Sequence, residues 1–121
     1  MKLKHVIIGI VVLLIDQITK IAAEATLSSD AISVIPGFFR LTYAENTGAA
    51  WSMLEGKMWF FYIITIIALI IMVMFYRNQK EADELVKVSL VLMMAGTIGN
   101  FIDRLCFQHV RDFLDFIIFG Y

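Results

Sequence analysis

Apolar residues gather in three long stretches that are separated by shorter polar segments. The clearest stretch, residues 58–76, has no charged side chain and carries aromatic residues at both ends. An α-helix needs about 20 mostly apolar residues to cross a bilayer, and aromatic side chains favour the two interfaces. Residues 5–24 and 86–103 are similar stretches that carry a few polar side chains. The pattern predicts three transmembrane helices, and Gly96 and Gly99 are expected to let the third approach a neighbour closely.

The segment between the first two stretches, residues 25–57, has no helical period. Its runs AISVI and FFRLTY are rich in β-branched and aromatic residues, and Pro36 and Gly37 lie between them. Such runs around a Pro-Gly pair are typical of two short strands joined by a turn. We therefore expect a mainly α-helical, polytopic membrane protein, a single membrane domain over residues 1–121 with a small β-sheet in residues 25–57.

The first apolar stretch also has features of a cleaved signal peptide. Two lysines precede the run VIIGIVVLLI, and Ala23-Glu24-Ala25 has the small-x-small pattern of a cleavage site. The sequence DQITK, however, places charges where a signal peptide should pass smoothly to its cleavage site. We favour a first helix that is retained.

The composition agrees with a membrane protein. Of the 121 residues, 60% are hydrophobic and 17% charged, and the mean hydropathy of +0.82 exceeds what a soluble domain of this size can bury. The formal net charge is −1 with scattered Lys and Arg, so no nucleic-acid binding is indicated. The single cysteine, Cys106, excludes an internal disulfide and is expected in a packed site.

The positions of Lys and Arg indicate an orientation. Cytoplasmic loops carry the excess of basic residues, and the effect is strongest in short loops such as residues 77–87. This bias places residues 25–57 and 103–121 outside the cytoplasmic membrane. The two sets are Lys2, Lys4, Arg77, Lys80 and Lys87 inside, and Arg40, Lys57, Arg104 and Arg111 outside.

Polar side chains repeat on one face of the first helix. Asp16, Lys20 and Glu24 follow one another at four-residue intervals and therefore stack. Charged groups at membrane depth are costly and normally face a protein interior or a wet cavity. We favour an internal ion pair over a catalytic role, because such pairs occur without doing chemistry.

A second polar group closes the third stretch, where Asn100 and Arg104 lie one turn apart with Asp103 beside them. Arg104 could anchor the helix at the interface, but three such side chains in five residues exceed what anchoring requires. In the outer segment, Asn46 and Gly48 fit either an ordinary turn or a site where the backbone approaches a ligand. The residues alone leave both interpretations open.

Asp103, Asp112 and Asp115 are the candidates for chemistry. Solvated surface charge is the ordinary alternative for a carboxylate. The stretch VRDFLDFIIF is amphipathic, however, and places its carboxylates near the membrane interface. A half-desolvated carboxylate there can have a raised pKa and act as an acid or base near neutral pH.

Together, the segments IDQITK, ENTGAAWS, GNFIDR and VRDFLDF resemble the ordered motifs of the lipoprotein signal peptidases, the type II signal peptidases of bacteria. The resemblance covers nearly the whole chain. It implies a membrane aspartic endopeptidase with four helices and an outer sheet cradle, three of the helices being present here. It also implies that diacylglyceryl-modified prolipoproteins are cleaved before the lipidated cysteine, at the outer face of the cytoplasmic membrane.

The resemblance assigns roles to single residues. Asp112 matches one of two catalytic aspartates, and a further aspartate, Asp103, matches a supporting position. Asp16 and Lys20 match a supporting pair on the first helix. No metal or cofactor is expected, and the partners implied are the prolipoprotein substrate and membrane lipid. The positions that match the substrate pocket are Asn46, Gly48, Asn100 and Arg104.

Two departures from the family stand out. The family continues past the aspartate block to an Asn-x-x-Asp sequence that supplies the second catalytic aspartate, whereas this sequence closes with IIFGY. We therefore expect a truncated chain that is inactive as given. Arg111 stands where the family usually has a small apolar residue.

A non-enzymatic transporter or channel subunit is the alternative function, with Asp16 as an ion site at mid-membrane. A transporter should keep ionisable groups near mid-bilayer on more than one helix. Here they gather toward one end, which favours the peptidase.

Overall fold

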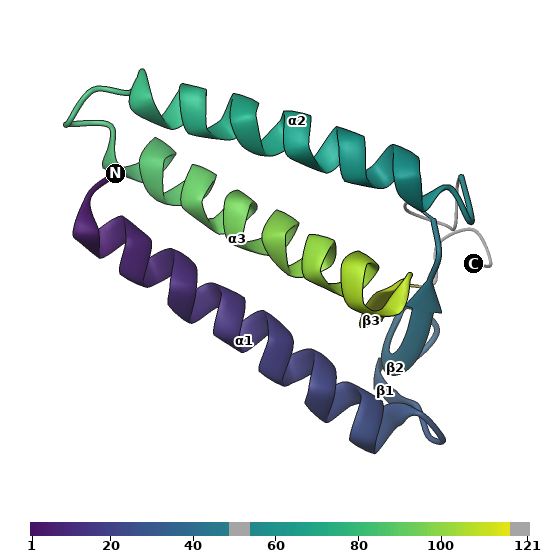
Figure 1. Ribbon diagram of the computed structural model, residues 1–121. Coiled ribbons are helices and arrows are strands. Elements are labelled where there is room, and N and C mark those ends of the chain that lie inside the picture. Colours follow the sequence, from purple (N-terminus) through teal and green to yellow (C-terminus); the bar gives the residue numbers. More distant parts are fainter. Residues whose placement is uncertain (49–53, 117–121) are drawn as a thin grey trace.

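Three long helices dominate the computed structural model, which describes residues 1–48 and 54–116. They are α1 (Leu3–Leu27), α2 (Met58–Arg77) and α3 (Glu84–Phe107), and each is longer than the predicted span. All three are long and apolar enough to cross a membrane. Figure 1 shows α3 lying between α1 and α2. The predicted mainly α-helical membrane fold is confirmed.

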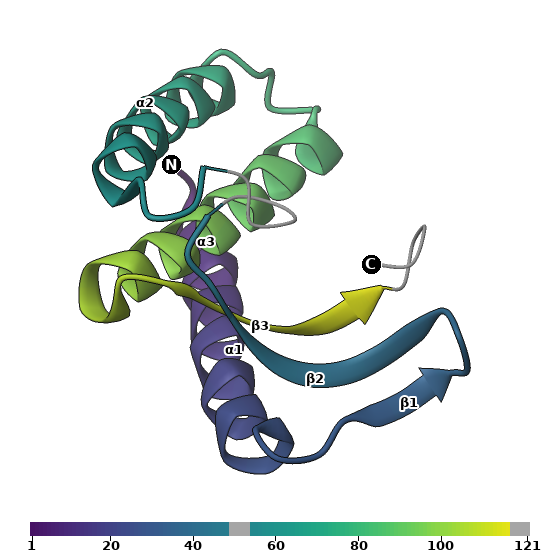
Figure 2. The same cartoon turned by 90° about the vertical axis from the view of Figure 1, so that its right-hand side faces the viewer.

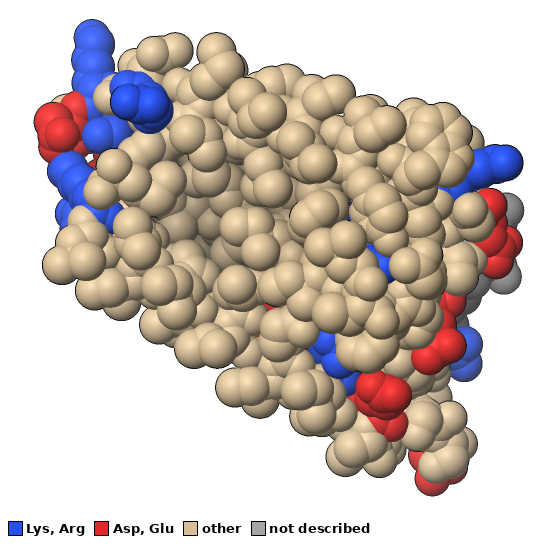
Figure 3. All heavy atoms as spheres, viewed as in Figure 1, with Lys and Arg blue, Asp and Glu red and all other residues tan. Residues whose placement is uncertain are grey.

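Most apolar side chains of the helices point away from the bundle. Only 11% of the most apolar window of α1 and 17% of that of α2 are buried. Figure 3 shows one uncharged face of this kind, with charged side chains gathered toward its two ends. So large an apolar surface is rare on a soluble monomer but is covered by lipid tails in a bilayer. The surface therefore supports a transmembrane position for the bundle.

The interior of the bundle is small. Tyr76 of α2 packs with Val91 and Met94 of α3, and all three side chains are buried. The single cysteine, Cys106, is exposed on α3. Its expected place in a packed site is therefore wrong, because no element of the described part of the chain covers this side chain. The partly buried residues around the core are Ile8, Leu69, Met72 and Leu90.

The closest approach of α1 and α3 occurs at Gly99. A Cβ atom added there would lie 2.2 Å from Oδ2 of Asp16, so a side chain at this position would collide with α1. At Gly96, an added Cβ would meet no atom within 4 Å. The prediction of a close approach is confirmed for Gly99 and wrong for Gly96, which lies on a different side of α3.

A three-stranded antiparallel sheet lies at one end of the bundle (Figures 1 and 2). Strands β1 (Ile32–Ile35) and β2 (Phe39–Asn46) are the two predicted strands. The Phe38 N–H donates to the Ile35 carbonyl at 3.0 Å, and Gly37 adopts a φ of +76° that suits glycine. The predicted turn is therefore present.

The third strand, β3 (Val110–Phe116), was not predicted. α3 ends at Phe107, and the residue that caps it, Gln108, has a left-handed φ of +64° that turns the chain back toward β2. β3 then pairs with β2, and Asp112 lies opposite Ala44 next to a register shift between Leu41 and Ala44. The segment VRDFLDF therefore forms the far side of a sheet whose first two strands come 64 residues or more earlier in the sequence.

Candidate functional site

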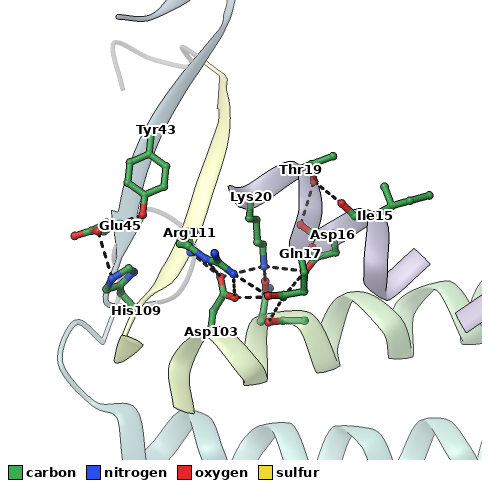
Figure 4. A network of polar contacts seen from close by, with 12 residues as sticks. Ile15, Asp16, Gln17, Thr19, Lys20, Tyr43, Glu45, Asp103, His109 and Arg111 are labelled. Atoms are coloured by element: carbon green, nitrogen blue, oxygen red, sulfur yellow. Dashed lines mark hydrogen bonds and ion pairs between the residues drawn. The ribbon is translucent and has the colours of Figure 1, made fainter. Parts of the chain in front are cut away.

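Asp103 is the centre of a buried polar cluster beneath the sheet (Figure 4). Its carboxylate accepts hydrogen bonds from Arg111, with Nη2 at 2.8 Å from Oδ1 and Nε at 3.2 Å from Oδ2. The Arg111 backbone N–H donates to Oδ2 at 3.0 Å. Such charge-assisted bonds are among the strongest in proteins. They fix the start of β3 against the end of α3.

Lys20 of α1 completes the charge balance of the cluster. Its buried Nζ lies 3.2 Å from Oδ2 of Asp103, 3.1 Å from Oδ2 of Asp16 and 3.0 Å from Oδ1 of Asn100. The expected ion pair of Asp16 with Lys20 is thus present and extends to α3. Glu24, one turn further along α1, is exposed. The cluster holds two carboxylates and two cations together where water is largely excluded.

Gln17 belongs to the same cluster, although it was not among the predicted site residues. Its Nε2 donates to Asp16 Oδ2 at 3.0 Å and lies 3.3 Å from both the Gly99 carbonyl and Asp103 Oδ1. Its Oε1 accepts from Arg111 Nη2 at 2.8 Å. The only available signal was its place in the polar sequence DQITK. Gln17 and Arg111 therefore connect α1, α3 and β3.

Asp112 points into a pocket of about 230 Å³ beside the cluster. The carboxylate is half-buried, and burial raises the pKa of Asp112 above its usual range. A hydrogen bond with Asn46 and the positive charge of Lys20 act in the opposite direction on that pKa. The pocket is lined by Asp16, Thr19, Lys20, Asn100, Arg111, Asp112, Phe113 and Leu114.

Asn46 and Gly48 form the turn that was one of the two interpretations left open by the sequence. The Gly48 N–H donates to Asn46 Oδ1 at 2.9 Å, which is a local turn contact. Asn46 also forms the hydrogen bond with Asp112 across β2 and β3. Residues 49–52 of the motif ENTGAAWS lie outside the described part of the chain.

The remaining candidates lie away from this pocket. Arg104 faces α2, with its guanidinium 4.5 Å from the centroid of the Phe61 ring. Its Nε is buried and has no hydrogen-bond partner among the described residues. Asp115 forms an ion pair with Arg40, its partner in β2. Of Asp103, Asp112 and Asp115, Asp112 is the one that lines this pocket. Within residues 1–48 and 54–116, Asp103 and Asp115 form ion pairs with cations, whereas Asp112 forms none.

The arrangement suits acid-base chemistry. A half-buried carboxylate with a raised pKa can exchange a proton with a bound water or substrate. Within residues 1–48 and 54–116, no group of three or more His, Cys, Asp or Glu side chains is placed to hold a metal ion.

Solved structures define the class of protein. One bacterial membrane enzyme, obtained by the in meso method at 2.3 Å, is 44% identical with a TM-score of 0.82 over 98% of this chain and 73% of its own. A second, at 1.9 Å, is 43% identical with a TM-score of 0.80 over 98% of this chain and 77% of its own. The fold is that of a bacterial membrane enzyme.

The sequence comparisons identify the family. The profile described as Signal peptidase (SPase) II matches residues 8–121. The lipoprotein signal peptidase of Staphylococcus haemolyticus (strain JCSC1435) is 47% identical over 95% of this chain and 73% of its own length. That of Bacillus pumilus (strain SAFR-032) is 42% identical over 97% of this chain and 76% of its own. The chain belongs to the signal peptidase II family, which confirms the resemblance carried by its four motifs.

Proposed function

We propose that this protein is a membrane aspartic endopeptidase that removes signal peptides from diacylglyceryl-modified prolipoproteins, cleaving before the lipidated cysteine. The observation that carries the proposal is Asp112, a half-buried carboxylate that faces a pocket at the sheet end of a membrane-spanning bundle. Membership of the signal peptidase II family supports the same substrate class.

The proposed chemistry requires two carboxylates that share a proton. One takes a proton from the attacking water while the other donates to the scissile carbonyl, and the pair titrates as a unit. Asp112 is well suited to one role. Asp16 and Asp103 are not suited to the other, because Lys20 holds both and Arg111 also holds Asp103.

The family resemblance implies that the second carboxylate comes from an Asn-x-x-Asp sequence that follows the aspartate block. In our proposal, Asp103, Asp16 and Lys20 act as positioning residues. They hold α1, α3 and β3 in one arrangement, and thereby fix the backbone next to Asp112.

Four further residues are proposed to receive the substrate. Asn100 lines the pocket, and Asn46 contacts Asp112 directly. Gly48 is buried in the loop after β2, where it keeps the backbone close to the site. Arg104 offers a guanidinium with one unsatisfied buried donor on the α2 side.

The proposed membrane position follows the basic residues. We place the sheet and Asp112 at the outer interface of the cytoplasmic membrane, with residues 77–87 in the cytoplasm. A substrate anchored by diacylglycerol presents its cysteine at the same depth. Single cysteines at Ser29 and Asn78, in a background with Cys106 replaced, should label from opposite sides. Labelling of both from one side would contradict the arrangement.

The activity is tested with this chain joined to a family segment that carries the Asn-x-x-Asp sequence, reconstituted with a diacylglyceryl-modified prolipoprotein. Asp112→Asn should reduce turnover by about 10²–10⁴-fold, because the amide keeps the shape but cannot act as the base. Asp30→Asn, a matched change at an exposed position between α1 and β1, should leave turnover unchanged. Cleavage by Asp112→Asn at the normal rate would remove Asp112 from the chemistry.

The same assay separates the proposal from the transporter alternative. A peptidase of this kind should cleave the diacylglyceryl-modified prolipoprotein and leave the form without the diacylglyceryl group intact. A transporter should cleave neither. The ionisable groups were expected toward one end of the bundle, but Figure 3 shows charged side chains toward both ends. A transporter should instead keep them near mid-bilayer.

A further inference from the structure

A second polar pocket lies at the end of the bundle opposite the sheet. It has a volume of about 380 Å³ and sits where α1 begins, α2 ends and α3 begins. Three cationic side chains and one carboxylate line it. The lining residues are Met1, Lys2, Tyr76, Arg77, Gln79, Glu81 and Lys87.

Lys87 is the most buried cation of this pocket, and the contacts described for its ammonium group are long. The side chain is buried, with 6% of it exposed, yet its Nζ lies 3.9 Å from Glu81 Oε1, beyond hydrogen-bond distance. Its other contact is with the face of Tyr76, 5.5 Å from the ring centroid. Lys20, at the sheet end, has three oxygen atoms within 3.2 Å. An ammonium has three donors, so Lys87 can accept an anionic ligand.

The carboxylate in the pocket does not cancel its positive charge. Glu81 pairs with Lys2 at 2.5 Å, and 78% of the Glu81 side chain is exposed. Lys2 and Glu81 can therefore separate toward solvent when another anion binds. Arg77 is exposed at the C-terminal end of α2, where it also faces the pocket.

An apolar groove lies beside this pocket along the helices. It has a volume of about 320 Å³, and Met1 lines both spaces. Its walls include Val6, Ile10 and Leu13 of α1 and Met94 and Ile98 of α3. Figure 3 shows this face hollowed between α1 and α2, near the end where the N-terminus lies. A polar pocket next to an apolar groove suits an amphipathic ligand.

We propose that this end of the bundle binds one anionic phospholipid. Its phosphate lies against Lys87, Arg77 and Lys2, and one acyl chain occupies the groove between α1 and α3. The ends of membrane-spanning helices lie at the level of the headgroups, and basic pockets between such helices bind anionic lipids. The inference rests on the transmembrane position of the helices and is independent of the peptidase activity.

The test counts lipids retained by the purified full-length protein in native mass spectrometry. Phosphatidylglycerol and phosphatidylcholine with identical acyl chains are offered in turn, and phosphatidylglycerol should be retained preferentially. Arg77→Gln should weaken its retention about fivefold, the effect of one basic residue near the headgroup. Lys80→Gln removes an equal charge from the same loop without lining the pocket, and should leave retention unchanged.

Two further measurements test each half of the site. Lys87→Gln should abolish the preference for phosphatidylglycerol, with folding checked by the melting temperature in detergent. Val6→Trp, at a position 37% exposed in the groove wall, should weaken retention of both lipids. Equal retention of the two lipids by the unsubstituted protein would overturn the proposal. So would stabilisation by inorganic phosphate equal to that by phosphatidylglycerol, which would indicate a small-anion site.

Discussion

Buried ionisable side chains occur at both ends of the helix bundle, and the two groups differ in which charge is left available. At the sheet end, Lys20 and Arg111 are each held by carboxylates, and Asp112 faces a pocket. At the opposite end, fully buried His5 contacts Tyr76 and Glu84, and Lys87 faces a pocket. One end therefore offers a carboxylate and the other an ammonium. A polar cluster that joins the ends of helices can therefore serve chemistry or binding. Which of the two it serves depends on whether a carboxylate or an ammonium group faces the neighbouring pocket.

The difference in burial gives the largest expected effect on folding. Asp103→Ala leaves Lys20 and Arg111 buried without their shared carboxylate and should lower the free energy of unfolding by about 3–5 kcal/mol. Glu84→Ala, the matched change at the other end, should cost about 1 kcal/mol, because 41% of that side chain is exposed and water can replace it. Denaturant titration in detergent measures both. Equal losses of unfolding free energy in the two variants would contradict the difference in burial between the two clusters.

Substitutions where α1 contacts α3 should have an intermediate effect on the free energy of unfolding. Gly99→Ala would drive a methyl group into Asp16, which is held by Lys20 and Gln17, and should destabilise the fold by about 1–3 kcal/mol. Gly96→Ala should be neutral or stabilising by up to about 1 kcal/mol, since the new Cβ meets nothing and alanine favours a helix. The melting temperature should fall for Gly99→Ala and should stay unchanged or rise for Gly96→Ala. A similar loss of stability in both variants would contradict the assignment of the tight contact to Gly99 alone.

The smallest effect concerns the pH dependence of turnover. The hydrogen bond from Asn46 favours the ionised form of Asp112, so Asn46→Ala should raise the pKa of that carboxyl further. In the proposed mechanism, Asp112 must be ionised to act as the base, so activity should be lost as the pH falls through its pKa. The acid limb of kcat/KM should move to higher pH in Asn46→Ala. Glu55→Gln, in the loop that follows β2, should leave the limb in place.

The sequence predicted the helices and two strands well, because hydropathy and turn residues are local signals. The strand Val110–Phe116 could not be predicted with equal ease, since its pairing partner, β2, lies before two helices. The site was found only in part for the same reason. Asp112 stood out as a carboxylate near the interface, but its contact with Asn46 depends on the register of β2 against β3. Gln17 is a common polar residue that gains its role only from the approach of α1 to Gly99.

The order of the strands also bears on how the protein is made. β2 is synthesised before α2 and α3, whereas its neighbour β3 follows them. During synthesis, the edge of β2 that pairs with β3 has no partner strand until both helices have been made and inserted. The contact of Asn46 with Asp112 can therefore form only after the bundle is in the bilayer. A nascent chain of this kind stays without its assembled site while it is being inserted.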